Sequence, residues 1–303
     1  MISLQHVQRF LQKTPEQRRI TVRFQIATLL AKVPYAPHRV HLDISSRERV
    51  DFWWSYFPMS FKPERGLFEY WDDDGGDLRF LWKNLRPGMT FLDVGAYHGL
   101  YSLIAAKKLG RGGKVFAFEP SPRERLRMMR HLRHNGVDSV CLESYALAAT
   151  PGTATFAVVV SGYTTMNSLR PPSTDDPTKQ IAVETTSFDA YLDQHRIESV
   201  DFVKIDAEGG ELEAFRGAKH LLTALRPVVI CEVLDLVTRG WGYAAKDIMS
   251  LLRSYGYEWF DVAADGSLRP HVPREEYVDV RNFVAVPAEK TASLDSGAAN
   301  ARA

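Results

Sequence analysis

The stretch FLDVGAYHG, residues 91–99, constrains the fold of this chain more than any other segment. A short apolar run leads into two glycines, Gly95 and Gly99, and a helical pattern of apolar residues follows them. In an open α/β sheet, the first strand, its turn and the following helix form the floor of the ligand site. The motif therefore predicts a buried strand at 91–94, a ligand-binding turn, and a helix at 97–109.

Strands and helices are predicted to alternate along most of the remaining chain. Further strand-like apolar runs occur at 114–120, 139–145, 201–206, 228–234, 257–261 and 281–287. Helical patterns lie between them, at 122–135, 187–195, 208–224 and 245–255. Such alternation is typical of βαβ units, so we expect a doubly wound, mostly parallel α/β sheet with helices on both faces. Two more strand-like runs, at 154–160 and 181–186, interrupt the alternation and predict an inserted hairpin or lid.

The chain divides into three parts by its composition. Residues 1–80 are interpreted as an accessory N-terminal extension, in which a basic helix precedes short strands and a second helix near 77–85. Residues 81–287 form the main domain, and residues 288–303 are small and polar, which predicts a disordered tail. The basic residues of the first helix fit a solvated face, and peripheral contact with a membrane surface is the alternative.

Charge and cysteine content argue against several classes of protein. The chain has 38 Lys and Arg against 37 Asp and Glu, a net charge of +1, so its bulk charge does not favour nucleic acid as a partner. No N-terminal apolar run approaches the ~18 residues of a membrane-spanning helix, and a signal-peptide pattern is lacking. Cys141 and Cys231 lie in strand-like runs and are expected to be buried, reduced thiols. A cytoplasmic location is therefore expected.

The residues of the glycine turn indicate which ligand it holds. A dinucleotide-binding turn needs a glycine where this chain has Tyr97, so a pyrophosphate would fit poorly. S-adenosylmethionine has no pyrophosphate, and a D-x-G-x-x-x-G turn suits it better. An acidic residue is expected at the end of the next strand, where it would accept the ribose hydroxyls. Glu119 ends that strand, 24 residues beyond Gly95.

Taken in order, these motifs resemble the FkbM-type methyltransferases, a family within the class I S-adenosylmethionine-dependent fold. The resemblance is carried by FLDVGAYHGLYSL (91–103), VFAFEPSP (115–122), HNG (134–136), DFVKIDAEGGELEAFRGA (201–218) and PVVICEV (227–233). The family usually has Asn at the position of Tyr97. The resemblance implies a seven-stranded Rossmann-like sheet and methylation of a hydroxyl on a saccharide, glycolipid or secondary metabolite.

The same resemblance implies S-adenosyl-L-methionine as the cofactor, held at three strand ends. The residues concerned are Asp93, Gly95, Ala96, Tyr97, Gly99, Glu119, Tyr145 and Ala146. A small-molecule or glycan acceptor would enter beside them, in a pocket shaped by the 161–180 loop and the N-terminal extension. No nucleic acid is expected as acceptor, because DAEG stands where base methyltransferases usually carry an Asn-Pro-Pro-Tyr-like turn.

Methyl transfer to oxygen requires an aligned acceptor that loses its proton. Asp206 and Glu232 end the fourth and fifth strands of the predicted main domain. Either Asp206 is the general base, or the two carboxylates hold a divalent cation such as Mg²⁺ that lowers the pKa of the acceptor hydroxyl. His98, inside the glycine turn, is a second candidate base. Asp206 would also suit the N-cap of the following helix, so a structural role stays open for it.

Three alternative functions follow from the same residues. A carboxyl methyltransferase of the same fold would form a methyl ester instead of an ether. A nicotinamide-dependent dehydrogenase would share the sheet, but Tyr97 disfavours it. A binding module without turnover is disfavoured by the acidic residues that the chain retains at its strand ends, Asp93, Glu119, Asp206 and Glu232.

Overall fold

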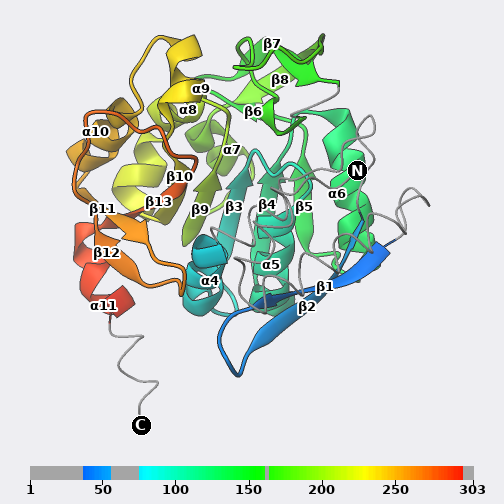
Figure 1. Ribbon diagram of the computed structural model, residues 1–303, viewed down its shortest axis with the longest axis vertical. Helices are drawn as coiled ribbons and strands as arrows, with labels where there is room; N and C mark the ends of the chain where they lie inside the picture. The colour runs from blue at the N-terminus through cyan, green and yellow to red at the C-terminus, as the bar shows by residue number, and fades with distance from the viewer. Residues whose placement is uncertain (1–36, 56–74, 161–163, 296–303) are drawn as a thin grey trace, which may run out of the picture.

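The structure is a computed structural model that describes residues 37–55, 75–160 and 164–295. Its centre is an eight-stranded sheet with the strand order β12-β11-β13-β10-β9-β3-β4-β5 (Figure 1). The strands are β3 (Thr90–Val94), β4 (Lys114–Phe118), β5 (Val140–Glu143), β9 (Phe202–Ile205), β10 (Val228–Glu232), β11 (Tyr257–Val262), β12 (Leu268–Pro270) and β13 (Asn282–Pro287). The five strands from β10 to β5 are parallel, and β13 runs antiparallel to β10 and β11.

The doubly wound, mostly parallel fold predicted from the alternating pattern is confirmed. The sheet has one strand more than the seven expected, because the short edge strand β12 pairs with β11. Helices of the structure are α4 (Gly75–Asn84), α5 (Leu100–Leu109), α6 (Pro122–His134), α7 (Phe188–Gln194), α8 (Glu211–Arg216), α9 (Asp235–Thr238), α10 (Lys246–Ser254) and α11 (Thr291–Asp295). Short helical turns are η1 (Gly110–Gly112), η2 (Thr164–Met166), η3 (Leu221–Leu225), η4 (Arg239–Trp241) and η5 (Ala288–Lys290).

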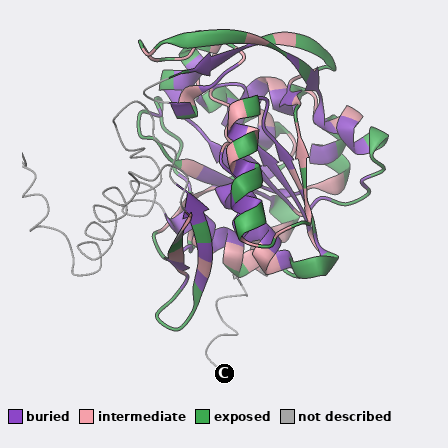
Figure 2. Ribbon diagram, turned by 90° about the vertical axis from the view of Figure 1, so that its right-hand side faces the viewer, coloured by how far each residue is buried: buried purple, intermediate pink, exposed green. Residues whose placement is uncertain are grey.

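Two apolar cores lie on opposite faces of the sheet. Alternate side chains of a strand point to opposite faces, so Phe91 of β3 packs with α4, α5 and α6, whereas Leu92 packs with α7, α8 and α10. Every residue of β3 is buried. Figure 2 shows the strands of the sheet as buried and the covering helices as exposed on their outer faces. This double covering explains why the parallel strands are continuous apolar runs.

The inserted hairpin predicted between the strands forms a separate small sheet. β7 (Gly152–Val159) and β8 (Thr178–Thr186) are antiparallel, and β6 (Ala146–Leu147) pairs parallel with β8. The small sheet lies beyond the carboxyl ends of β3 and β4 (Figure 1). It therefore stands where the ligand site of a doubly wound sheet is expected.

The N-terminal hairpin, β1 (Pro37–Asp43) and β2 (Arg49–Ser55), packs against α6. Asn135 accepts a hydrogen bond from the backbone of Trp53 and donates one back to it, at 2.9 and 2.7 Å. The ring of His131 stacks on Trp54 with 3.7 Å between ring centroids. The hairpin thereby extends the core on the α6 side. The helix predicted to begin at Thr14 lies outside the described residues.

The helix predicted at 208–224 forms as two shorter pieces, α8 and the π-helical turn η3. Glu208 and Gly209 have φ values of 50° and 91°, which an α-helix cannot accommodate. A Cβ on Gly209 would lie 2.5 Å from the ring of Trp241, so glycine is required there. The turn after β9 is therefore longer than predicted, and α8 begins at Glu211.

Two details near the strands and the C-terminus differ from the sequence-based expectations. Cys231 is buried, but Cys141 is exposed because β5 is an edge strand; both thiols are free. Part of the predicted disordered tail forms η5 and α11, where Glu289 pairs with Arg226 at 2.5 Å. In the part of the chain that the structure describes, no helix has the length and apolar character needed to cross a membrane.

Candidate active site

The glycine turn after β3 is held between two neighbouring strands. The backbone N–H groups of Gly95 and Ala96 both donate to the carbonyl oxygen of Phe118, at 3.0 and 3.1 Å. Gly95 has φ 72°, and a Cβ there would lie 1.8 Å from the backbone oxygen of Asp206. Gly99 has φ 82°, and a Cβ there would overlap Met128. The two glycines of the motif are therefore required by close approach as well as by their backbone conformation.

Glu119 lies at the end of β4 and faces this turn. Its side chain accepts hydrogen bonds from the backbone N–H groups of Tyr97 at 2.9 Å and Ser121 at 2.8 Å, one at each oxygen. The residue is only 4% exposed, and burial raises the pKa of its carboxyl group to about 8. A carboxylate oxygen can accept more than one hydrogen bond, so Glu119 retains acceptor capacity toward a ligand.

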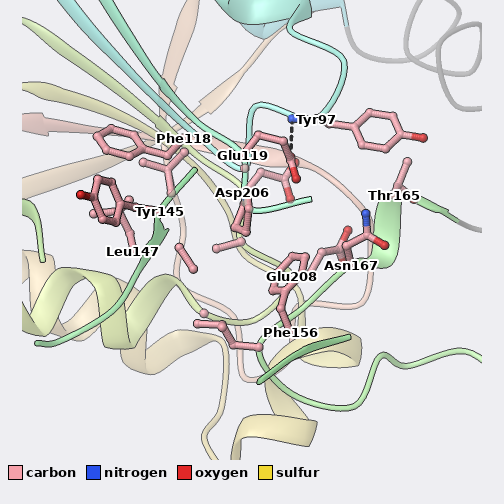
Figure 3. Close-up of a pocket in the computed structure, with 17 residues that line it drawn as sticks. Tyr97, Phe118, Glu119, Tyr145, Leu147, Phe156, Thr165, Asn167, Asp206 and Glu208 are labelled. Carbon is pink, nitrogen blue, oxygen red and sulfur yellow. Dashed lines mark hydrogen bonds between the residues drawn. The ribbon is translucent and has the colours of Figure 1, made fainter. Parts of the chain in front are cut away.

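A cavity opens between the large sheet and the small sheet. Its lining side chains and turns include Gly95, Tyr97, Phe118, Glu119, Tyr145, Ala146, Leu147, Phe156, Thr165, Asn167, Leu169, Asp206 and Glu208. Figure 3 shows Phe118, Tyr145 and Leu147 on one side and Thr165 and Asn167 on the other. Glu119, Asp206 and Glu208 lie between the two sides. The cavity therefore joins an apolar wall to a polar wall across a carboxylate-rich middle.

Tyr97 links the glycine turn to the small sheet. Its φ of 49° is unusual for a tyrosine and turns the chain sharply between the two glycines. Its hydroxyl group is hydrogen-bonded to Thr164 Oγ1 at 2.7 Å. Its ring stacks on that of His98, with 3.7 Å between the centroids. Tyr97 thus lines the cavity through its turn and secures the start of the 164–169 segment.

His98, a predicted candidate base, lies behind Tyr97 and does not line the cavity. It is 3% exposed, and Arg127 Nη1 lies 3.3 Å from its Nε2 atom. Burial, together with His131 and Arg127, lowers the pKa of His98 well below its usual value. The Nδ1 atom of His131 lies 2.8 Å from the backbone carbonyl oxygen of His98, within hydrogen-bonding distance. These contacts place His98 among the packing residues between α6 and the turn.

Asp93 is also turned away from the cavity. Its Oδ2 atom accepts hydrogen bonds from the backbone N–H and the hydroxyl of Ser102, at 2.9 and 2.5 Å. It is 2% exposed, and burial raises its pKa to about 6. Asp93 therefore fixes the start of α5 relative to β3. Asp93 would affect a ligand in the cavity indirectly, by fixing the shape of the turn.

Asp206 lines the cavity beside a buried lysine. Its Oδ2 atom lies 3.2 Å from Nζ of Lys204, and its side chain is 27% exposed. Lys204 is 1% exposed and also lies over the ring of Tyr101 at 5.2 Å. The cap of α8 is Gly210, so Asp206 does not have the capping role considered for it. The ion pair involves Oδ2, and no described residue forms a hydrogen bond with the Oδ1 atom of Asp206.

Three further carboxyl groups surround Asp206. Glu208 lines the cavity, whereas Glu211 accepts backbone hydrogen bonds from Ala207 at 2.7 Å and Gly209 at 3.3 Å. Glu232 is 9% exposed and does not line the cavity, and no described residue bonds its Oε2 atom. Burial and the neighbouring carboxylates raise the pKa of Glu208 and of Glu232 well above the usual range. Both groups therefore favour their protonated forms.

The donor set does not suit the divalent cation considered for Asp206 and Glu232. Asp206 is paired with the ammonium group of Lys204, and Glu232 lies outside the cavity lining. Across the described residues, no three His, Cys, Asp or Glu side chains form a group that could hold a metal ion. Divalent cations require several oxygen ligands, commonly carboxylates. Asp206 and Glu232 are therefore not expected to hold a divalent cation.

The polar wall contains residues that the sequence does not single out. Asn167 and Thr165 come from the segment between β7 and β8, which was predicted only in general terms to shape the acceptor pocket. Asn167 has no signal in the sequence, because its position depends on the register of the inserted hairpin.

Lys204, behind the cavity, differs in this respect. It stands in an apolar strand, and a charged residue in such a strand is a detectable signal of pairing.

Comparisons with known proteins bear on the family of the chain. Hexuronic acid methyltransferase AglP of Haloferax volcanii is 25% identical over 153 residues, 50% of this chain and 59% of that protein. Ribosomal RNA large subunit methyltransferase E of Sorangium cellulosum is 50% identical over 38 residues, 12% of this chain and 18% of that protein. The chain thus spans less than two thirds of the length of either relative.

Solved methyltransferases align with the chain at low TM-scores and low identity. A methyltransferase FkbM from Methylobacillus flagellatus KT aligns with a TM-score of 0.43 and 14% identity, covering 67% of this chain and 44% of that chain. The O-methyltransferase from Bacillus cereus, in complex with SAH, aligns with a TM-score of 0.40 and 13% identity, covering 93% and 94%. Residues 93–259, more than half of the chain, match the family model described as the methyltransferase FkbM domain, and the protein therefore belongs to the FkbM methyltransferase family.

Proposed function

We propose that this protein is an S-adenosylmethionine-dependent O-methyltransferase that acts on a hydroxyl of a saccharide, glycolipid or similar metabolite. The observation that carries the proposal is Glu119, a buried carboxyl group at the end of β4 that faces the cavity. Its two oxygens each accept one backbone N–H and retain capacity for more. A pair of adjacent hydroxyls, such as those of a ribose, is the ligand group that this arrangement suits.

The rest of the cavity suits the remaining parts of the same cofactor. Phe118, Tyr145 and Leu147 offer an apolar wall for the adenine, and the turn at Gly95 offers backbone close to the amino-acid end. S-adenosylmethionine supplies an electrophilic methyl group on its sulfonium. A nicotinamide dinucleotide is disfavoured because Tyr97 occupies the place where its pyrophosphate needs a glycine. Aligned binding of cofactor and acceptor is expected to provide a large part of the rate enhancement.

Asp206 is the residue that we assign as general base. It lines the cavity, and its Oδ2 atom is paired with the ammonium group of Lys204. As the acceptor oxygen bonds the methyl carbon and the carbon–sulfur bond breaks, the hydroxyl proton passes to Oδ1 of Asp206. Neither His98 nor Glu232 lines the cavity, which disfavours both for this step.

The acceptor atom is assigned from the same arrangement. A relative of this chain is a hexuronic acid methyltransferase, which supports a sugar acceptor. A hexuronic acid offers both hydroxyls and a carboxyl group, so a methyl ether and a methyl ester are both chemically available. A carboxylate needs no base, because it is already ionised at neutral pH. The presence of Asp206 in the cavity therefore favours a hydroxyl acceptor and an ether product.

The proposal is tested by methyl transfer from labelled S-adenosylmethionine to a fractionated extract of the source cells. Base-stable label in a carbohydrate or glycolipid fraction is expected, since an ether resists mild base. Label released as methanol would instead identify a carboxyl methyltransferase. Label on protein or nucleic acid would contradict the acceptor class. Binding of NADH in preference to S-adenosylhomocysteine would contradict the cofactor itself.

A further inference from the structure

We infer that Asn167 binds a second hydroxyl of the acceptor, adjacent to the hydroxyl that is methylated, so that the acceptor is a vicinal diol. This inference rests on the proposed function and names the substrate class of the same site. It follows from three features: the anchoring of the 164–168 segment, the fixed orientation of the Asn167 amide, and the chemistry of the two walls of the cavity.

The segment that carries Asn167 is anchored at both ends. At one end, Thr164 Oγ1 is hydrogen-bonded to the hydroxyl of Tyr97 at 2.7 Å. At the other end, Ser168 Oγ donates to the backbone oxygen of Glu208 at 3.0 Å. Ser168 also forms a β-bridge with Ala157, with backbone bonds of 2.8 and 3.1 Å. The segment is therefore tied to the glycine turn, to the turn after β9 and to the small sheet.

The amide of Asn167 has one orientation. Its Oδ1 atom accepts the backbone N–H of Val159 at 2.8 Å, and an N–H donor there requires an oxygen. The NH₂ group is consequently the free end of the side chain, and no described residue accepts a hydrogen bond from it. The residue is 9% exposed and lines the cavity (Figure 3). Because Asn167 borders the cavity, an acceptor atom of a ligand there would be a partner for this donor.

Asn167 lies apart from the side of the cavity that we assign to the cofactor. Phe118 and Tyr145, assigned to the adenine, lie on the opposite side, and Glu119, assigned to the ribose, lies between (Figure 3). Asn167 lies on the other side, next to Thr165, and Asp206 lines the cavity between the two sides. Its amide is therefore available to the molecule that enters beside the cofactor.

The pair of Asn167 and Asp206 offers one donor and one acceptor of hydrogen bonds. The reacting hydroxyl gives its proton to Asp206, whereas the neighbouring hydroxyl accepts a hydrogen bond from the Asn167 amide. Adjacent hydroxyls of a pyranose or furanose present these two functions together. An ammonium group has no lone pair for the amide, so an amine at this second position is disfavoured.

The test combines periodate chemistry with a substitution that preserves the local fold. Periodate cleaves vicinal diols, so treating the cell extract with periodate and quenching it before the assay destroys such acceptors. The purified full-length protein is then given labelled S-adenosylmethionine with treated or mock-treated extract. We expect incorporation in the mock-treated extract and at least a tenfold loss after periodate.

Asn167→Asp is the informative variant. It keeps an oxygen for the Val159 N–H and replaces only the donating NH₂ group. We expect the half-saturating amount of extract to rise by about tenfold, as for a lost substrate hydrogen bond, with the dissociation constant of S-adenosylhomocysteine changed by less than about twofold. Asn84→Asp is the matched control, because among the described residues the side chain of Asn84 bonds only Phe80 of its own helix α4. It should leave both values unchanged.

The outcomes separate this inference from the proposed function. Base-stable label that survives periodate treatment, or an unchanged half-saturating amount in Asn167→Asp, would overturn the diol assignment alone. Weakened S-adenosylhomocysteine binding in Asn167→Asp would assign the residue to the cofactor instead and overturn the inference. Absence of any transfer by the wild-type protein would overturn the proposed function and the inference with it.

Discussion

Replacing Glu119 by alanine is expected to weaken the binding of S-adenosylhomocysteine by at least tenfold. The carboxyl group is 4% exposed, and each of its oxygens already accepts one backbone N–H, from Tyr97 and from Ser121. Two further charge-assisted hydrogen bonds from ribose hydroxyls would contribute about 1.5 to 3 kcal/mol each. Their sum, about 3 to 6 kcal/mol, is the gross gain that the substitution removes.

Burial of Glu119 reduces this gain. Its pKa is raised to about 8, so at pH 7 ionising the carboxyl group costs about 1.4 kcal/mol. Subtracting this cost from the lower bound leaves about 1.6 kcal/mol, a little more than tenfold in the dissociation constant. The same reasoning predicts a pH dependence. Because the ionised form binds, affinity should rise by up to about tenfold per pH unit between pH 6 and 8, and level off above pH 8.

Isothermal titration calorimetry of wild-type protein and Glu119→Ala at pH 6, 7, 8 and 9 would measure both effects. Glu258→Ala is a matched control, because Glu258 is exposed on β11. The alanine variant should lose the pH dependence together with the affinity. An equal dissociation constant in wild type and Glu119→Ala would remove Glu119 from the cofactor site. A wild-type affinity that is flat across this pH range would contradict the argument from ionisation.

Three other outcomes are expected. Gly95→Ala should lower the free energy of unfolding in urea by about 1 to 3 kcal/mol, because its Cβ would lie 1.8 Å from a backbone oxygen. Gly152→Ala should leave the free energy of unfolding unchanged, because its Cβ would lie 3.6 Å from the hydroxyl of Thr185. Exhaustive chelation should leave methyl transfer unchanged; activity that returned only with Mg²⁺ would contradict this. At an acceptor concentration that saturates the wild-type protein, Asp206→Asn should reduce the turnover rate by about 10²–10⁴-fold. Glu232→Gln should reduce it far less under the same conditions.

The main sheet was predictable because its strands are buried on both faces. A strand such as β3 must then be apolar along its whole length, and such runs stand out between glycine turns and helices. The glycine turn and Glu119 were predictable for a related reason: parallel strands place their carboxyl ends at one edge of the sheet. Gly95 of this turn and Glu119 do line the cavity, together with Tyr145 and Ala146.

The side-chain directions at the turn were not predictable. The sequence shows Tyr97 and His98 as neighbours inside a ligand-binding motif, and both were candidates for the site. The left-handed conformation of Tyr97 directs its hydroxyl to Thr164 and leaves His98 stacked behind it. A positive φ at a tyrosine has no signature in the sequence, since glycine and asparagine are the residues that favour it. Asn167 escapes prediction because its partner, Val159, is set by tertiary register.

The buried lysine of β9, Lys204, is paired with one of several carboxyl groups near the cavity. Nζ of Lys204 lies 3.2 Å from Oδ2 of Asp206. Glu208 and Glu232 have raised pKa values because burial and nearby carboxylates disfavour a second and third charge. A protonated carboxyl group cannot accept the proton of an acceptor hydroxyl, and only an ionised one can. Of these three carboxyl groups, Asp206 is the one that both lines the cavity and is paired with a cation, and for this reason we propose it as the base. The sequence alone does not distinguish it from its acidic neighbours.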